Sequence, residues 1–431
     1  MNQHKENKHL IVFVSNFPFG LSEPYFATEL SYLIKDFYKI SIVPSDLSKE
    51  AKRDKIYFPL PPEVRIHNWT IAHRKKQYIN GFFKGLFSKI FWNELRYIFF
   101  EFKSDHTNLG LLYGKWLAFK VAFVSWCRAS TTASYIQNEF LDKKEVENSV
   151  FYSYWCTDVT LGMALLKERG RKEAMVTRIH AWDLYFYRDA SGYLPFRKCI
   201  LKNLDATFSI SQAGKNYLVD RIGKEVERKV HIARLGSDRI LAPPYFPKSK
   251  TLRILSISKI IPLKRIDLLV ASLAIAKSSV SICWHHWGGT DSLIQRSAES
   301  ALTGVDFHFF PFAAKENFYK HLSENTYDIL VNLSTSEGLP VSMMEAMSLG
   351  IPVVATDVGA VSEIVQHGET GWLLPVDSSP QEIAQRLIHI AHLETEQMAL
   401  FRKKAHCNWN NYFNSAKNYP EFSEKLFRLN S

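Results

Sequence analysis

The N-terminal half of the chain alternates between short apolar runs and longer stretches in which apolar residues have helical spacing. The runs at 9–15 and 39–43 have the composition of β-strands, and residues 24–36 between them repeat apolar side chains as an amphipathic helix does. Further strands are expected at 149–154, 175–180, 206–210 and 229–233. Strands that alternate with helices predict a parallel sheet with helices on both faces.

A second alternating series follows residues 242–249, a short proline-rich stretch that predicts a linker between two domains. Helices are expected at 267–276, 340–349 and 379–392, and strands at 253–258, 280–284, 306–310, 328–333, 352–356 and 371–374. We therefore predict an α/β protein with two doubly wound, Rossmann-like domains, 1–241 and 250–405. Two such domains facing each other leave a cleft for two substrates.

The composition is that of an ordinary folded protein, since 46% of the 431 residues are hydrophobic and 23% are charged. The five cysteines are odd in number, scattered and free of Cys-x-x-Cys pairs, which argues against a disulfide framework or a zinc knuckle. The polar residues 1–9 and the short apolar run after them do not fit a signal peptide. We therefore expect a cytoplasmic protein.

The net charge of +11 favours an acidic partner. Residues 74–126 interleave aromatic and basic side chains, which suits helices lying on an anionic membrane surface, here the inner face of the cytoplasmic membrane. The alternative is a pair of helices that close over the N-terminal core. We do not expect nucleic acid as a partner, because the segment has no motif of a known reading module.

The most informative stretch runs from Ser334 to Met347. A strand is expected to end near Ser334, a tight loop to hold Glu337, and Pro340 to open a helix. Backbone amides at such a helix start form an anion site. Glu345 lies in the next turn among methionines, where a carboxylate is costly unless it has hydrogen-bond donors. Two carboxylates beside a phosphate site suit sugar hydroxyls; the alternative is a surface loop followed by a helix-capping glutamate.

This Glu-x7-Glu spacing with Gly-Leu-Pro inside resembles the GT-B glycosyltransferases of the family 4 type. In that family the first glutamate lies near the donor sugar and the second holds the ribose hydroxyls. The resemblance therefore implies that Glu337 is catalytic and that Glu345 binds the donor. The remaining donor-binding positions that it implies in this motif are Gly338, Leu339, Pro340 and Val341.

Residues 256–267 resemble the family's strand-loop-helix, which carries two basic residues for the diphosphate, here Lys259 and Lys264. A departing nucleoside diphosphate gathers negative charge, which fixed cations stabilise. The family more often has arginine where Lys259 stands and glycines where Ser258 and Arg265 stand. A solvated basic loop is the alternative interpretation.

The resemblance is looser in the N-terminal half. Gly20 and Glu23 look like part of the family's first loop, which faces the acceptor and the donor phosphate. His180 is expected at the end of a strand, where a histidine of the family contacts the donor sugar and supports catalysis. In GT-B enzymes a C-terminal helix crosses back to the first domain, which implies the same for 406–431.

Together these features predict a retaining glycosyltransferase that uses a nucleotide-sugar donor, with UDP or GDP as the favoured nucleotide, and neither a metal nor another cofactor. The acceptor implied is a glycan or a lipid-linked oligosaccharide of capsule, exopolysaccharide or O-antigen (lipopolysaccharide) synthesis. One alternative is a sugar-nucleotide epimerase or hydrolase on the same fold. Another is a non-enzymatic protein that binds membrane surfaces. A dinucleotide-dependent oxidoreductase is disfavoured, because no strand is followed by Gly-x-Gly-x-x-Gly.

Overall fold

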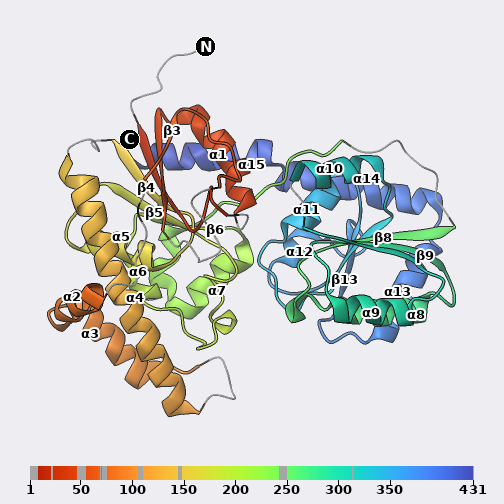
Figure 1. Cartoon of the computed structure of the whole chain (residues 1–431), viewed down its shortest axis with the longest axis horizontal. Helices are drawn as coiled ribbons and strands as arrows, with labels where there is room; N and C mark the ends of the chain where they lie inside the picture. Colours follow the sequence, from red (N-terminus) through yellow and green to blue (C-terminus); the bar gives the residue numbers. More distant parts are fainter. Residues whose placement is uncertain are drawn as a thin grey trace. The chain divides into compact units, whose positions relative to one another are not determined.

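A computed structural model describes residues 8–20, 23–45, 55–67, 69, 75–104, 110–143, 148–241, 250–312 and 315–430. The chain forms two compact units, one from Met1–Ala233 with Tyr419–Ser431 and the other from Arg234–Asn418. Each unit is a parallel β-sheet flanked by helices (Figure 1). The prediction of two Rossmann-like α/β domains is therefore confirmed.

The first unit is built on seven parallel strands in the order β3-β2-β1-β4-β5-β6-β7. Their bounds are β1 His9–Val14, β2 Lys39–Pro44, β3 Val64–Ile66, β4 Ser149–Ser153, β5 Ala174–Ile179, β6 Ala206–Ser209 and β7 Val230–Ile232. The chain builds outward from β1 to β3 on one side and then restarts at β4 on the other. The strand order thus reverses between β1 and β4, and such switch points bind ligands in open α/β sheets.

Helices cover both faces of this sheet. They are α1 Pro24–Asp36, α2 Lys75–Leu86, α3 Lys89–Arg96, α4 Leu111–Glu139, α5 Asp158–Glu168, α6 Arg197–Asn203, α7 Gln212–Ile222 and, from Tyr419 on, α15 Ser415–Phe427. Side chains alternate along β1, so that Ile11 and Phe13 join the core beneath α4 and α5. Leu10 and Val12 join the core beneath α1 and α15 instead. Burial on both faces explains why this strand is apolar from Leu10 to Val14.

The second unit holds six parallel strands in the order β10-β9-β8-β11-β12-β13. Their bounds are β8 Thr251–Ile257, β9 Ser281–Trp287, β10 Asp306–Phe310, β11 Ile329–Asn332, β12 Val353–Thr356 and β13 Gly371–Leu374. The helices are α8 Ile266–Ala276, α9 Ser292–Ala301, α10 Lys315–Glu324, α11 Val341–Ser348, α12 Val361–Ile364, α13 Pro380–Ala391 and α14 Thr395–Tyr412. The strand order here reverses between β8 and β11.

The bounds of the units differ from those predicted at 241 and 406. Ser237 belongs to the second unit, where its hydroxyl accepts a hydrogen bond from Trp409 Nε1 at 2.8 Å. Trp409 therefore belongs to the second unit, whereas the predicted crossing helix at 406–431 would have placed it against the first. The crossing begins at Tyr419, and Phe422 packs edge-on against Tyr152 of the first unit. The predicted linker 242–249 lies outside the described residues.

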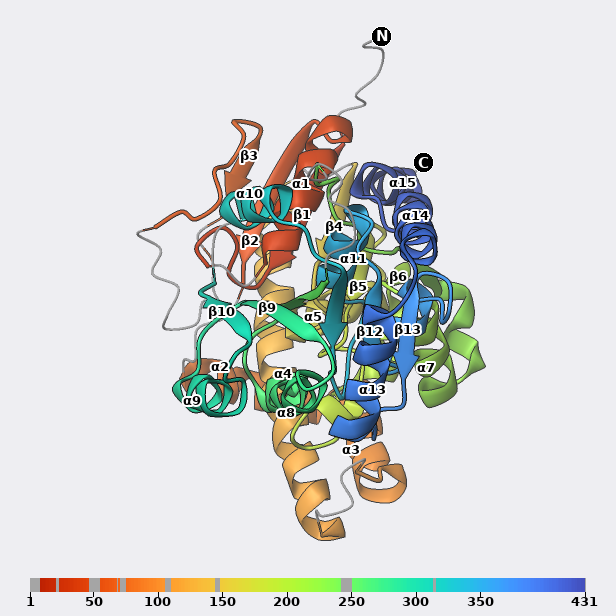
Figure 2. The same ribbon diagram turned by 90° about the vertical axis from the view of Figure 1, so that its right-hand side faces the viewer.

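The aromatic and basic segment forms α2, α3, a π-helical turn at Tyr97–Glu101 and the first half of α4. The helices α2 and α3 lie beside α4 (Figures 1 and 2). Their inner faces close over the core, as one alternative predicted: Trp126 Nε1 donates to Gly81 O at 3.0 Å. A Cβ on Gly81 would lie 2.6 Å from Cys127 Sγ, so this helix crossing requires glycine.

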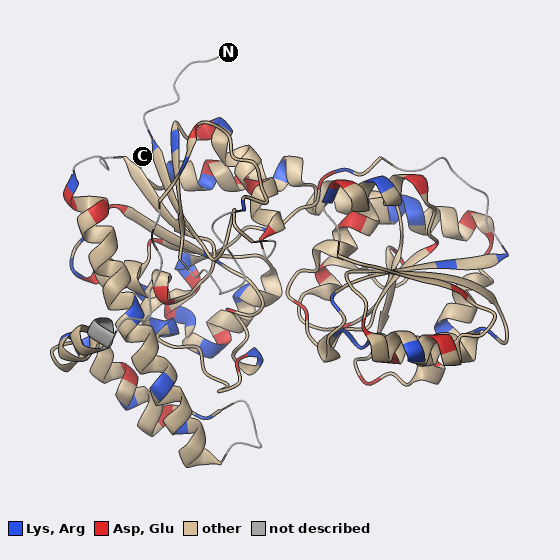
Figure 3. Cartoon of the chain, in the orientation of Figure 1, with Lys and Arg blue, Asp and Glu red and all other residues tan. Residues whose placement is uncertain are grey.

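These helices and the π-helical turn expose a set of apolar side chains, which we call the aromatic face: Ile79, Phe82, Phe83, Leu86, Phe87, Trp92, Phe99, Phe100, Leu111, Leu112, Tyr113 and Trp116. Among the described residues, no helix combines the length and the apolar character needed to cross a membrane. Lysine and arginine residues are scattered over the helices of both units, with acidic residues between them (Figure 3).

Candidate functional site

The predicted donor-binding residues gather at the switch point of the second unit. Lys259 and Lys264 lie in the loop after β8, and Glu337 lies in the loop after β11, the strand that pairs with β8. Both loops leave the carboxyl ends of parallel strands, where ligands bind in open α/β sheets. The strand order therefore brings together two motifs that are far apart in the sequence.

Glu337 is held in place through one of its two oxygens. Its Oε1 accepts hydrogen bonds from Lys264 Nζ at 2.5 Å, Ser334 Oγ at 2.7 Å and Asn332 Nδ2 at 3.2 Å. Its Oε2 has no protein partner among the described residues. The carboxylate is thus oriented by three donors and keeps one oxygen for a ligand. Lys264, predicted only as a diphosphate cation, also neutralises this buried carboxylate.

The start of α11 follows the predicted pattern with one correction. Pro340 is the residue before the helix rather than its first residue, since α11 begins at Val341. The amide of Met343 bonds to Pro340 O at 3.2 Å, whereas those of Val341 and Ser342 have no acceptor within the helix. Free amides and the positive end of the helix dipole favour an anion here. Gly338, Leu339 and Pro340 are all buried in this turn.

The loop after β8 contains an arginine in a backbone conformation that favours glycine. Arg265 has φ +49°, and its guanidinium donates to Leu333 O at 2.5 Å and to Val376 O at 2.6 Å. These bonds join the loops that follow β8, β11 and β13. Arg265 Nη2 and Ser258 Oγ are buried without a partner among the described residues. Lys259 is exposed and makes no ion pair within the described part of the chain.

Glu345 is buried in α11, and its Oε1 accepts a hydrogen bond from Tyr319 Oη of α10 at 3.1 Å. Burial raises the pKa of Glu345 to about 7, although the Tyr319 hydroxyl and the nearby Lys315 ammonium act in the opposite direction. Lys315 is itself paired with Asp238 at 2.5 Å. Sequence reasoning missed Tyr319, because nothing in the spacing links α10 to the glutamate motif.

The glycine turn after β9 brings its backbone against the loop after β8. Gly288 has φ +124°, and a Cβ there would lie 2.3 Å from Ser258 O. On the preceding residue, the Trp287 ring stacks on Phe310 with centroids 4.5 Å apart and planes 7° apart. Asp291 Oδ1 then caps α9 by accepting hydrogen bonds from the amides of Leu293 and Ile294.

In the first unit, Glu23 organises the loop that follows β1. Its carboxylate accepts hydrogen bonds from the amides of Ser15, Asn16 and Phe17 at 2.7–2.8 Å and from Trp155 Nε1 at 2.6 Å. With four donors and 1% exposure, this carboxylate shapes the loop, whereas the sequence predicted a direct contact with acceptor or phosphate. Gly20, the other residue predicted there, ends the described part of this loop.

His180 follows directly after β5, as predicted, and is buried. Its ring packs against those of Trp155 and Tyr154, with centroids 4.3 Å and 4.9 Å away. Neither ring nitrogen has a hydrogen-bond partner among the described residues. Burial, with a contribution from Arg178, lowers the pKa of His180 well below its usual value, so the ring is neutral at physiological pH. The Trp155 side chain contacts two of the predicted site residues, because its ring packs against His180 and its Nε1 donates a hydrogen bond to Glu23.

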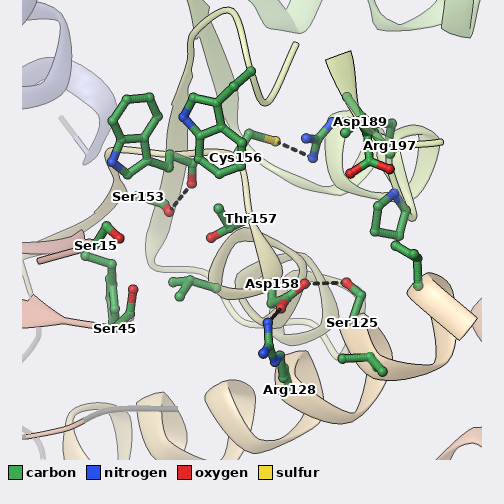
Figure 4. A pocket seen from close by; sticks show the side chains of 18 of the residues that line it. Ser15, Ser45, Ser125, Arg128, Ser153, Cys156, Thr157, Asp158, Asp189 and Arg197 are labelled. Atoms are coloured by element: carbon green, nitrogen blue, oxygen red, sulfur yellow. Dashed lines mark hydrogen bonds and ion pairs between the residues drawn. The ribbon is translucent and has the colours of Figure 1, made fainter. Parts of the chain in front are cut away.

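A cavity of about 450 Å³ opens at the switch point of the first unit (Figure 4). It lies at the carboxyl ends of β1 and β4, and the helix face that carries Lys120, Val124 and Arg128 of α4 forms one wall. Residue-by-residue prediction from the sequence did not find this cavity, because its walls come from segments more than a hundred residues apart.

Polar side chains on the cavity wall are held in fixed positions. Asp158 accepts from Ser125 Oγ at 2.5 Å and pairs with Arg128 Nη1 at 3.3 Å (Figure 4). On another side of the cavity, Arg197 donates to Cys156 Sγ at 3.0 Å and to Asp183 O at 2.6 Å. The cavity therefore offers oriented cations and hydroxyls, the groups that bind a phosphorylated or hydroxyl-rich ligand.

The fold of the two units is that of the GT-B class of glycosyltransferase structure. Solved structures agree: TarM superposes with a TM-score of 0.66 at 14% identity over 98% of this chain and 99% of its own. HepE of Anabaena in complex with UDP superposes with a TM-score of 0.63 at 16% identity over 97% and 99% of the two chains.

More particularly, residues 240–406 match the family "Glycosyl transferases group 1". The amylovoran biosynthesis glycosyltransferase AmsK of Erwinia amylovora is 25% identical over 215 residues, which are 47% of this chain and 51% of AmsK. The chain thus aligns with about half the length, or less, of the curated relatives it matches first. The family match contains all the donor-binding residues predicted in the second unit.

Proposed function

We propose that the chain is a glycosyltransferase that moves a sugar from a nucleoside diphosphate to an acceptor hydroxyl. The observation that carries this proposal is the pairing of Lys264 with Glu337 beside the free amides at the start of α11. One site thereby offers cations and amides for a diphosphate, and an oriented carboxylate for a sugar hydroxyl. The match of residues 240–406 to the group 1 family supports this proposal.

In this proposal the diphosphate lies against the amides of Val341 and Ser342, with Lys259 and Lys264 as counter-charges. Glu337 Oε2 accepts a hydrogen bond from a sugar hydroxyl, and Glu345 accepts from the ribose hydroxyls. UDP or GDP is the donor nucleotide, and the UDP complex of HepE supports UDP. Neither a metal nor another cofactor enters the scheme, since lysines and a helix start balance the leaving charge.

The proposed reaction retains the anomeric configuration. The acceptor oxygen attacks the anomeric carbon from the face that the diphosphate leaves, so one C–O bond forms as the other breaks. The leaving phosphate oxygen takes the acceptor proton. Because His180 is neutral, it acts on the donor sugar through a hydrogen bond rather than through charge. Anomeric couplings of the product, measured by NMR, test this scheme, and an inverted linkage would contradict it.

For the acceptor we propose a glycan linked to a lipid through phosphate, used in polysaccharide synthesis as the name of AmsK suggests. The helix α4 supports this choice, because it joins two features. Lys120 and Arg128 line the cavity, while Trp116 and Tyr113, one and two turns before Lys120, belong to the aromatic face. An amphiphile could place its phosphate at the cationic wall and its lipid along the aromatic face.

The donor proposal is tested by thermal stabilisation with a panel of nucleotides. A nucleotide at a hundred times its dissociation constant adds about 2.7 kcal/mol to the free energy of unfolding. We expect UDP or GDP to raise the melting temperature of the wild type and not of Glu345→Ala. Glu316→Gln, an exposed change on α10, serves as the control and should respond as the wild type does. No response to any nucleotide would remove the transferase proposal.

The exposed aromatic face favours a second property, peripheral binding to anionic membrane at the cytoplasmic side. We expect the full chain to co-sediment with vesicles that contain anionic lipid. A variant that combines Phe82→Ser, Phe83→Ser, Phe87→Ser and Lys89→Gln should lose this co-sedimentation. The control variant carries Leu400→Ser and Tyr412→Ser, which replace two exposed hydrophobic residues of α14. Unchanged binding of the first variant would refute the role of this face. Vesicle binding without a nucleotide response would favour a non-enzymatic surface protein.

A further inference from the structure

Four potential metal ligands lie on one face of the sheet in the second unit. Cys283 and His285 alternate on β9, and Asp306 and His308 alternate on β10. The two strands pair in parallel with Asp306 opposite Cys283 and His308 opposite His285. Side chains two residues apart lie on the same face of a strand. The register therefore brings a thiol, two imidazoles and a carboxylate together.

Two distances between ligand atoms in this cluster are close to those of tetrahedral coordination. Cys283 Sγ lies 3.7 Å from His285 Nε2 and 3.4 Å from Asp306 Oδ2. Ligand atoms of these three residues all lie within 4.8 Å of one another. Zinc binds sulfur at about 2.3 Å and nitrogen or oxygen at about 2.0–2.2 Å, so tetrahedral ligands of one ion stand about 3.5 Å apart. A cation would need only small side-chain movements to bind here.

The outer nitrogen of His285 is fixed as it is in metal centres. His285 Nδ1 lies 2.6 Å from Tyr327 Oη, which lies 2.7 Å from His321 Nε2. When the hydroxyl of Tyr327 donates to His321, its oxygen accepts from His285 Nδ1. His285 then carries its proton on Nδ1 and presents the bare Nε2 to the cluster. Histidine ligands of metals almost always donate their second nitrogen in this way.

We propose that Cys283, His285 and Asp306 bind one zinc ion. Thiolate, imidazole and carboxylate are all zinc ligands, and zinc binds such ligands in tetrahedral geometry. The fourth position falls to His308, whose Nε2 lies 3.3 Å from Asp306 Oδ1, or to water. Binding releases the thiol proton of Cys283 to solvent and changes no oxidation state.

This site is separate from the donor site. Asp306 is the first residue of β10, whereas the donor loops follow the carboxyl ends of β8 and β11. The ion would join β10, the outermost strand of the described sheet, to its neighbour β9. Outer strands expose backbone groups on one side and separate readily. The zinc ion therefore stabilises the pairing of β10 with β9. The site lacks the Cys-x-x-Cys spacing by which structural zinc sites are recognised in sequences.

The test uses the full chain without a histidine tag, stripped of metal by a chelator under reducing conditions. We expect one Co²⁺ per chain, with the near-ultraviolet absorption of a cobalt–thiolate bond, and its displacement by Zn²⁺. Cys283→Ser should remove this absorption and weaken Zn²⁺ binding at least 100-fold in a chelator competition. Tyr327→Phe should weaken it 10- to 100-fold, as losses around metal ligands do. Zn²⁺ should raise the melting temperature of the wild type and not of Cys283→Ser.

Cys407→Ser, at an exposed thiol of α14, is the matched control and should bind Zn²⁺ within twofold of the wild type. Asp306→Asn preserves the shape of the cluster and decides the question if Cys283→Ser does not fold. A wild type that binds no Co²⁺ would overturn the proposal. So would a cobalt–thiolate absorption that survives in Cys283→Ser, or a folded Asp306→Asn with wild-type affinity.

Discussion

Glu345→Gln separates the stability of the second unit from its proposed binding of nucleotide. Glutamine keeps the size of the side chain and an oxygen for the Tyr319 hydroxyl but cannot ionise. Burial raises the pKa of Glu345 from 4.5 to about 7, which corresponds to about 3 kcal/mol. Between these two values the folded protein holds a proton that the unfolded chain has lost. The contribution of Glu345 to stability is therefore complete below pH 4.5 and is lost as the pH rises toward 7.

Urea unfolding at several pH values measures this effect. We expect Glu345→Gln to match the wild type near pH 4.5 and to exceed its free energy of unfolding by as much as about 3 kcal/mol at pH 8. Glu316→Gln, exposed on α10, should show no such trend. A difference between Glu345→Gln and the wild type that stays constant from pH 4.5 to 8 would refute the reasoning.

As the pH rises, the affinity for UDP should increase while the contribution of Glu345 to the free energy of unfolding decreases. In the proposed site Glu345 accepts from the ribose hydroxyls, and its ionised form is the stronger acceptor, so the UDP affinity of the wild type should rise by up to about tenfold between pH 6 and 8. The terminal phosphate of UDP also titrates near pH 6, as phosphate groups do. Because Glu345→Gln retains only this second dependence, calorimetry on both proteins isolates the contribution of Glu345.

Three further outcomes follow from buried charges. Lys264→Ala removes the proposed diphosphate cation and the partner of Glu337, and should weaken UDP binding about 10- to 100-fold by calorimetry, with Lys264→Arg as the milder control. Arg178→Met leaves the fully buried Glu29 unpaired and should cost about 3–5 kcal/mol in urea unfolding, whereas adding Glu29→Gln should restore much of it. Glu23→Ala removes the acceptor of three loop amides and should speed their hydrogen exchange; unchanged exchange would contradict its role.

Much of the fold could be predicted because most elements are long or strongly periodic. The strands at Asp306–Phe310 and Gly371–Leu374 and the helix Pro24–Asp36 lie where the sequence placed them. The strand Val64–Ile66 is too short to show alternation. The helix Lys315–Glu324 is mostly polar, so its apolar positions did not distinguish it from a loop.

For the candidate site, the sequence predicted which residues lie in the loops after the strands but not which of their side chains are in contact. The positions of Lys264 and Glu337 follow from local motifs, but their contact depends on β8 pairing with β11. Tyr319, on another helix, donates a hydrogen bond to Glu345, and no local sequence pattern predicts this contact. At Glu23 the sequence predicted a ligand contact, whereas the structure shows a carboxylate that accepts three hydrogen bonds from its own loop and one from Trp155.

The discontinuous first unit has a consequence for biosynthesis. Phe422 and Leu426 are buried in its core, yet a ribosome makes them after the whole second unit. At about 5–20 residues per second, residues 234–431 take roughly 10–40 s to synthesise. Throughout that time Tyr152 and Phe208, which Phe422 covers in the finished protein, stay uncovered. The second unit can thus complete its fold first, and chaperones that hold the nascent first unit should set the yield of active protein.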